Sequence, residues 1–258
     1  VLNLEYLQAQ FYSFAVFGEG LDAALLTGSG TQGAAVGGRR VAFADPVIAQ
    51  QAREIAREQR DQVEYLRELL ASYVAAQPQI DISGGAAGAF TAMARGAGLV
   101  GANQAFNPYA SDDNFLLAAF FLQDLAVTAY QGAHALLNST QLRDVFAGLL
   151  AAEAFHASAV RTTLFLRGMA RPELQDATVA ISDYRDSLDG PEDKDQGVVR
   201  GNNRLANIVP ANGNGLGFGR RPGEVLNILY LRRPDVDEGG FFPQGVNGVV
   251  TTSDDNAG

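Results

Sequence analysis

The chain has 258 residues, of which 47% are hydrophobic, and a formal net charge of −10 at pH 7. It is long enough to bury a substantial core, and its acidity argues against a nucleic-acid partner, because nucleic-acid phosphates are bound by Lys and Arg. The absence of cysteine excludes disulfides, zinc–thiolate sites and iron–sulfur clusters, and two histidines are too few for an all-histidine metal site. No apolar run approaches the ~18 residues of a membrane span, so none is expected.

The N-terminal part of the chain predicts two long helices. Apolar residues recur near helical spacing over residues 2–26, and a glycine-rich stretch then ends the pattern. Asp45-Pro46 combines a helix cap with a first-turn proline, which predicts a charged, amphipathic second helix that continues until Pro78. The small-residue segment 84–98 predicts a short helix inside a long crossover.

Two further long helices follow the crossover. Ser111 and the two aspartates after it are typical of a helix N-terminus, and they predict a third helix up to residue 137. The fourth helix is expected over residues 142–169. Four long helices with a long connection between the second and third are the wiring of a ferritin-like bundle. The sequence therefore predicts a mainly α, ferritin-like four-helix bundle over residues 1–170.

The remaining residues, 171–258, are expected to form an irregular C-terminal tail. They contain two shorter helix candidates, 177–188 and 222–233, between extended segments rich in Gly, Asn and Asp. The glycines between 213 and 219 are spaced as in a phosphate loop, but no strand precedes them and no Lys-Ser/Thr follows, so a plain loop is expected. A tail of this composition buries little apolar surface alone. We therefore expect it to wrap its own bundle or a neighbouring subunit.

The fourth helix carries an acid and an imidazole inside an apolar run. Glu153 and His156 are three residues apart, so they lie on one face and can reach a common point. Four-helix bundles bind metals with Glu-x-x-His from two helices and one Glu from each of the others. By itself the spacing more often belongs to an ordinary polar pair, whereas in a bundle it marks a candidate metal-ligand pair.

Several blocks of the sequence, in this order, resemble the ferritin-like, desiccation-related proteins of plants and bacteria. The blocks are "LNLEYLQAQFYSFAVFGEGLDA", "FNPYA" leading to "LAVTAYQGA", "LLAAEAFHASAVRTTL", "ISDYRDSLDG" and "GGFFPQGVNG". The resemblance covers nearly the whole chain. It implies a ferritin-like bundle with a family-typical tail, export from the cytoplasm and a role in tolerance of drying and stress.

The metal-site pattern that the resemblance implies is only partly present. Glu5 matches the carboxylate of the first helix, and Glu153 with His156 matches the Glu-x-x-His of the fourth. The other ligand positions have all become glutamine: Gln59 and Gln62 on the second helix, and Gln123 on the third.

Charge decides how this set of residues is interpreted. Two divalent ions bring four positive charges, and Glu5 and Glu153 leave about two of them uncompensated, each costing several kcal/mol to bury. An ordinary di-iron centre is therefore not expected, unless a different helix phase brings in Asp124, Glu58 or Asp61.

Two alternatives remain open. In one, Glu5, Glu153 and His156 bind a single Fe, Mn or Zn ion. In the other no metal binds, and the three glutamine amides donate hydrogen bonds to the two carboxylates while His156 bridges them. The second is favoured, because glutamine keeps the reach of glutamate and adds the donors that an emptied carboxylate site needs.

Two neighbours of the site are expected around it. Tyr12 lies two turns after Glu5 and is interpreted as a core tyrosine with a hydrogen-bonded hydroxyl, and Asp124 lies beside Gln123. The functional hypothesis is a stress-related, homo-oligomeric structural or binding module, assembled through the bundle surface and the tail. The alternative is a mononuclear Fe or Mn enzyme acting on oxygen or peroxide.

The location of the protein is expected to be periplasmic, cell-envelope or extracellular. The start "VLNLEYLQAQF" already lies inside a helical pattern and lacks an initiator Met, which we interpret as a processed or trimmed N-terminus. The family resemblance implies the same location.

Overall fold

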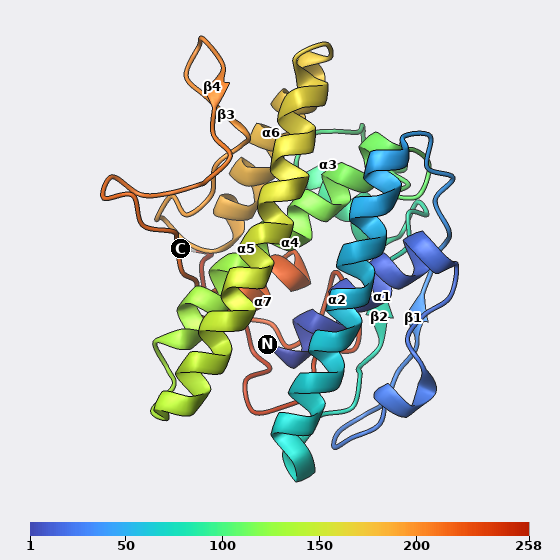
Figure 1. The fold of residues 1–258 in the computed structure, drawn as a ribbon, viewed down its shortest axis with the longest axis vertical. Helices are drawn as coiled ribbons and strands as arrows, with labels where there is room; N and C mark the ends of the chain where they lie inside the picture. Colours follow the sequence, from blue (N-terminus) through green and yellow to red (C-terminus); the bar gives the residue numbers. More distant parts are fainter. Residues whose placement is uncertain (258) are drawn as a thin grey trace.

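Four long helices form the body of the molecule. The computed structural model describes residues 1–257 and is mainly helical (Figure 1). The long helices are α1 (Leu2–Phe17), α2 (Pro46–Leu70), α4 (Asp112–His134) and α5 (Thr140–Gly168). Helix α1 packs mainly against α2, and α4 packs mainly against α5, while narrower contacts join α1 to α4 and α2 to α5. The long crossover lies between α2 and α4, so the ferritin-like bundle expected from the sequence is confirmed.

The helices start where capping residues were expected. The Asp45 side chain accepts a hydrogen bond from the Val47 amide at 2.9 Å, and Ser111 Oγ accepts one from the Asn114 amide at 3.2 Å. Helices α1 and α4 are buried on nearly all sides, whereas α2 buries one stripe and exposes its charges. Within residues 1–257, α4 alone is long and apolar enough to span a membrane by composition, but 83% of the segment concerned is buried inside the fold.

The first two long helices end well before the residues that the sequence pattern predicted, and α4 ends at His134, three residues before the predicted residue 137. The prediction of a helix up to residue 26 was wrong, because Gly18 takes a left-handed conformation with φ of 82° and ends α1 at Phe17. The apolar residues after it reach the core from an irregular segment with a short 3-10 turn, Ala23–Leu25. Helix α2 ends at Leu70 and not near Pro78, because Ala71 has a positive φ of 49°.

The crossover contains α3 (Ala89–Gly96), as predicted, and one short strand pair. Strand β1 (Ala35–Val36) comes from the α1–α2 connection and pairs in parallel with β2 (Ile80–Asp81), with Ala35 opposite Ile80. The Asp81 carboxylate accepts hydrogen bonds from the amides of Ser83 and Ala89, which fixes the start of α3. The strand pair therefore joins the α1–α2 connection to the α2–α4 connection.

The C-terminal residues lie against their own bundle. Helix α6 (Pro172–Leu188) packs on α4 and α5, and α7 (Pro222–Tyr230) packs on α4 and α6. Between them, β3 (Val199–Arg200) and β4 (Leu205–Ala206) form a small antiparallel hairpin that projects from the molecule (Figure 1). The glycine-rich residues 213–219 form neither helix nor strand. Phe241, near the end of the chain, is fully buried, and its ring lies 5.5 Å from that of Phe121 on α4.

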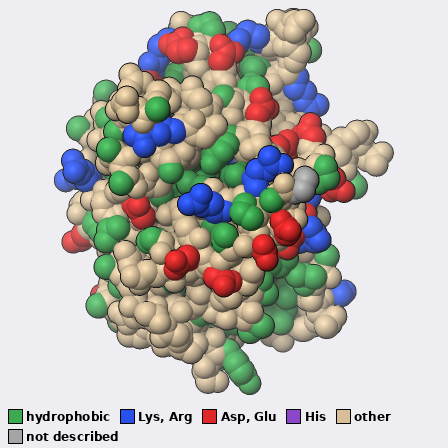
Figure 2. All heavy atoms as spheres, turned by 180° about the vertical axis from the view of Figure 1, so that it is seen from behind, with side chains coloured by type: hydrophobic (Ala, Val, Ile, Leu, Met, Phe, Trp, Pro, Cys, Tyr) green, Lys and Arg blue, Asp and Glu red, His purple; other side chains and the backbone are tan. Residues whose placement is uncertain are grey.

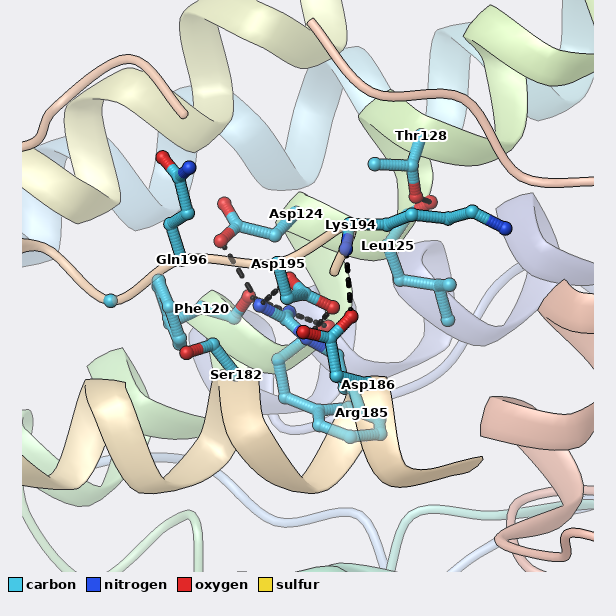
Figure 3. Close-up of polar contacts among 12 residues, drawn as sticks. Phe120, Asp124, Leu125, Thr128, Ser182, Arg185, Asp186, Lys194, Asp195 and Gln196 are labelled. Carbon is cyan, nitrogen blue, oxygen red and sulfur yellow. Dashed lines mark hydrogen bonds and ion pairs between the residues drawn. The ribbon is translucent and has the colours of Figure 1, made fainter. Parts of the chain in front are cut away.

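Charged residues also fix the tail to the bundle (Figure 3). We call this group the arginine cluster: Arg161, Arg185 and Arg220 with Asp124, Asp189 and Asp195, all buried. Arg185 of α6 donates to Asp124 of α4 at 3.1 Å and to Asp195 at 2.6 Å. Three arginines face three aspartates, so the cluster is neutral, and its members come from both bundle and tail. The low exposure makes each pair expensive to break.

Candidate functional site

A second polar cluster lies in the middle of the bundle, and every long helix contributes to it. Glu5 and Gln8 come from α1, Gln59 from α2, Gln123 from α4 and Glu153 from α5. All five side chains belong to residues with no solvent-exposed area. We call this group the Glu153 site. Glu5 and Gln8 are one turn apart and so lie on the same face of α1, a helix that is buried on nearly all sides.

The carboxylate of Glu153 is the centre of the hydrogen bonding. Gln59 Nε2 donates to Glu153 Oε1 at 2.6 Å, and Gln123 Nε2 donates to Oε2 at 3.0 Å. Gln8 Nε2 approaches Oε2 at 3.3 Å and donates to Gln123 Oε1 at 2.7 Å. Amides from three helices therefore donate to one buried carboxylate. Such bonds to a charged acceptor are each worth about 1.5–3 kcal/mol.

Glu5 is held differently. Tyr130 on α4 donates its hydroxyl proton to Glu5 Oε1, and no glutamine amide among residues 1–257 donates to this carboxylate. Burial, followed by the nearby charge of Glu153, raises the pKa of Glu5 to about 8. At pH 7 the Glu5 carboxyl group is therefore mostly protonated and adds little negative charge to the site.

His156 connects the buried site to the surface. Its Nδ1 lies 3.4 Å from Glu153 Oε1, and its Nε2 contacts the carboxylate of Glu58, whose side chain is 47% exposed. Burial alone would lower the pKa of His156, but Glu153 and Glu58 together raise it to about 9. The imidazole is therefore charged at neutral pH and lies between two acids, one inside the bundle and one at its surface.

Several buried oxygens of this region have no hydrogen-bond partner within residues 1–257. They are Glu5 Oε2, Gln8 Oε1, Gln59 Oε1, Gln62 Oε1 and the Tyr12 hydroxyl. Tyr12 is fully buried as expected, and its hydroxyl has no hydrogen-bond partner among residues 1–257, so the expected hydrogen bond remains a prediction. Its ring packs against Phe11 and Phe115, so aromatic contacts hold it in place.

The structure does not bring every expected residue to the site. Gln62 lies one turn beyond Gln59, yet its amide donates to neither Glu5 nor Glu153 within the described chain, residues 1–257. Asp124 belongs to the arginine cluster, because it pairs with Arg161 at 2.6 Å and with Arg185. Because both arginines bind its carboxylate, Asp124 does not take part in the Glu153 site.

Two participants were missed by the sequence analysis. Gln8 follows Glu5 by three residues, the same spacing that singled out Glu153 and His156. Tyr130 follows Gln123 by two turns. Both signals are periodic, but glutamine and tyrosine are not ligand types that a metal-site pattern selects.

The bundle fold and the carboxylate–amide–imidazole interior define the class of protein. The family model "Ferritin-like domain" matches residues 1–166, and the chain belongs to this ferritin-like family.

Two curated plant proteins are similar over most of their length. The chain is 27% identical to "Ferritin-like catalase Nec2" of Nesocodon mauritianus, over 96% of this chain and 82% of that protein. It is 28% identical to "Desiccation-related protein PCC13-62" of Craterostigma plantagineum, over 96% of this chain and 80% of that protein. No solved structure matches the chain significantly.

Proposed function

We propose that this protein is a stress- or desiccation-related, ferritin-like structural or binding module in which a hydrogen-bond network built from glutamine amides takes the place of a di-metal centre. The single observation that supports it is the set of amide groups from Gln8, Gln59 and Gln123 around Glu153. An amide N–H occupies the directions in which a metal ion would approach the carboxylate oxygens. The desiccation-related relative supports the physiological part of the proposal.

The donor set does not fit paired metal ions. Within residues 1–257, no group of three or more His, Asp or Glu side chains is arranged to hold an ion. Glu153 accepts hydrogen bonds from glutamine amides at both of its carboxylate oxygens. Two divalent ions would add four positive charges to a buried region whose only carboxyl groups, among residues 1–257, are those of Glu5 and Glu153. The energetic balance therefore favours the metal-free network.

One experiment tests the proposal directly. The purified protein is exposed to Fe(II), Mn(II) or Zn(II), dialysed and analysed for metal content. We expect less than one ion per chain. As the matched comparison, the triple variant Gln59→Glu, Gln62→His and Gln123→Glu restores the ligand types of the bundle pattern and should gain bound metal. Stoichiometric metal in the unchanged protein, lost on Glu153→Gln, would refute the proposal.

A second candidate function has its own support. The unpartnered oxygens of Glu5, Gln59 and Gln62 are acceptors that a single cation could satisfy, and one relative is named a catalase. This alternative is a mononuclear Fe or Mn enzyme acting on oxygen or peroxide through Glu5, Glu153 and His156. Peroxide decomposition by the metal-exposed protein, abolished by His156→Asn, would favour it over the metal-free network.

The proposal also includes homo-oligomer assembly through the bundle surface and tail, and a location outside the cytoplasm. Light scattering of the purified protein checks the first by its particle mass. Fractionation of the source cells checks the second.

A further inference from the structure

The chain contains three Asn-Gly pairs, at residues 212–213, 214–215 and 247–248. Such a pair can modify itself, because the backbone nitrogen of the glycine can attack the side-chain carbonyl carbon of the asparagine. Glycine permits this approach best, since it has no Cβ and adopts a wide range of backbone angles. The reaction needs an asparagine side chain that is free to turn and a glycine amide that the side chain can reach. The structure gives the three pairs different surroundings.

Hydrogen bonds on both ends of its side-chain amide protect Asn247. Its Oδ1 accepts from the Thr31 amide at 2.9 Å, and its Nδ2 donates to the carbonyls of Thr31 at 2.8 Å and Ala76 at 2.9 Å. Thr31 belongs to the α1–α2 connection and Ala76 to the α2–α4 connection. The side chain is therefore held between two other parts of the chain, and it cannot turn toward Gly248 while these bonds persist.

The other two Asn-Gly pairs lie in the segment 211–219, which follows β4 and contains no charged residue. This segment projects from the side of the molecule (Figure 1) and forms the tan projection at the right-hand edge of the view from behind (Figure 2). Residues 212–215 are all exposed. A side-chain carbon added at Gly213 or Gly215 would meet no atom of residues 1–257 within 4 Å, chain neighbours aside. Open space therefore surrounds both pairs.

Hydrogen bonds within the segment distinguish Asn214 from Asn212. Asn212 Oδ1 accepts from the amides of Asn214 at 2.9 Å and Leu216 at 3.1 Å, which holds its side chain inside the turn. The side chain of Asn214 forms no hydrogen bond with residues 1–257, so it is free to turn. The Gly215 amide donates to the Asn212 carbonyl at 3.0 Å, and this bond must open before the nitrogen reacts. Exposed backbone bonds in loops open at little cost in free energy.

From these contacts we infer that Asn214 is the main site of spontaneous deamidation in this protein. The Gly215 nitrogen forms a bond to Asn214 Cγ and gives up its proton, and the side-chain nitrogen leaves as ammonia. Water then opens the cyclic imide at one of its two carbonyl carbons, which yields aspartate or isoaspartate. Either product adds a carboxylate to an uncharged segment, and isoaspartate also lengthens the backbone of the turn. Water is the only co-reactant, so this inference is independent of the proposed function.

Incubation of the purified protein at pH 8, followed by peptide mapping with tandem mass spectrometry, tests the inference. We expect Asn214 to convert first, Asn212 more slowly and Asn247 least. The same incubation in unfolding concentrations of urea should bring the three rates together and speed the conversion of Asn247 by about tenfold or more, because its hydrogen bonds are lost.

Two variants of exposed asparagines serve as a matched pair. Asn214→Gln should abolish most of the conversion in the folded protein, because the longer glutamine side chain forms the cyclic imide far less readily. Asn202→Gln makes the same change at an exposed asparagine that no glycine follows, and it should convert as the unchanged protein does.

Several outcomes would overturn the inference. Equal rates at Asn214 and Asn247 in the folded protein would show that the fold does not control the reaction. Faster conversion at Asn212 would show that the two N–H donors activate its side-chain carbonyl and do not protect it. Conversion of Asn214 only in urea would show that the bond from the Gly215 amide to the Asn212 carbonyl blocks the reaction.

Discussion

The substitution Glu153→Gln tests the hydrogen-bond network most directly. The carboxylate offers four acceptor directions, and three amides and one imidazole are directed at it. A glutamine at this position keeps one oxygen and turns an NH₂ group toward N–H donors on the other side, whichever way it is rotated. The amide N–H of Gln59, or those of Gln8 and Gln123, then face the new NH₂ group and lose their acceptor.

The expected loss follows from these contacts. One or two charge-assisted bonds disappear, at about 1.5–3 kcal/mol each, and the charged His156 keeps only Glu58 as a partner. We therefore expect the free energy of unfolding to fall by about 3–5 kcal/mol. The control is Gln62→Leu, which removes a buried amide that donates to neither acid, and it should change stability by less than about 1 kcal/mol.

Urea denaturation at pH 7, followed by circular dichroism, measures both variants under metal-free conditions. A loss below about 1 kcal/mol for Glu153→Gln would refute the network, since it would mean that the three amide donors contribute almost nothing. If Glu153→Gln is less stable than the unchanged protein only when both are measured with added metal, the carboxylate would instead be assigned to ion binding.

Three further predictions concern the same structure. Both Glu5 and His156 bind protons more tightly when folded, with pKa values raised to about 8 and about 9, so unfolding free energy should decline as pH rises from about 6.5 to 9. Denaturation across this range measures the decline, which should be shallower in Glu5→Gln; a flat profile would contradict the assignment. Arg185→Met leaves Asp124 and Asp195 short of a partner and should cost about 3–5 kcal/mol, with a melting temperature that stays depressed in 1 M salt; recovery in salt would contradict a buried pair. Gly18→Ala should lower the free energy of unfolding by about 1–2 kcal/mol in denaturant titrations, because the φ of 82° at Gly18 is left-handed. The added Cβ would lie at an ordinary 3.4 Å from Arg40 Cβ, so backbone strain and not a clash causes the loss. No loss would mean that α1 does not need a left-handed residue at its end.

The sequence was informative about the bundle because its signals are local. A cap such as Asp45-Pro46 acts within one helical turn, and the spacing of Glu153 and His156 determines a shared face wherever the helix lies. The early end of α1 was missed because the apolar residues after Gly18 keep helical spacing while reaching the core from an irregular segment. Apolar spacing alone does not distinguish a helix from an irregular segment that reaches the core at the same positions.

The partners inside the bundle could not be read from the chain in the same way. Which amide donates to Glu153 depends on the rotation of four helices about their axes, and a small rotation separates Gln59, which donates, from Gln62, which does not. Asp124 shows the same limit, because its partner Arg185 lies in the tail. Long-range charge pairing leaves no periodic signal in the sequence.

The arginine cluster has a consequence for how a newly made chain folds. Arg161 of α5 donates to the backbone carbonyls of Gln196, Gly197, Asn207 and Ile208, all of which leave the ribosome after the four bundle helices. Until those residues emerge, the guanidinium group has few acceptors besides Asp124, and the groove of α4 that Phe241 fills stays open to water. A chain that ends after residue 171 lacks these acceptors, so we expect it to unfold more easily than the full chain.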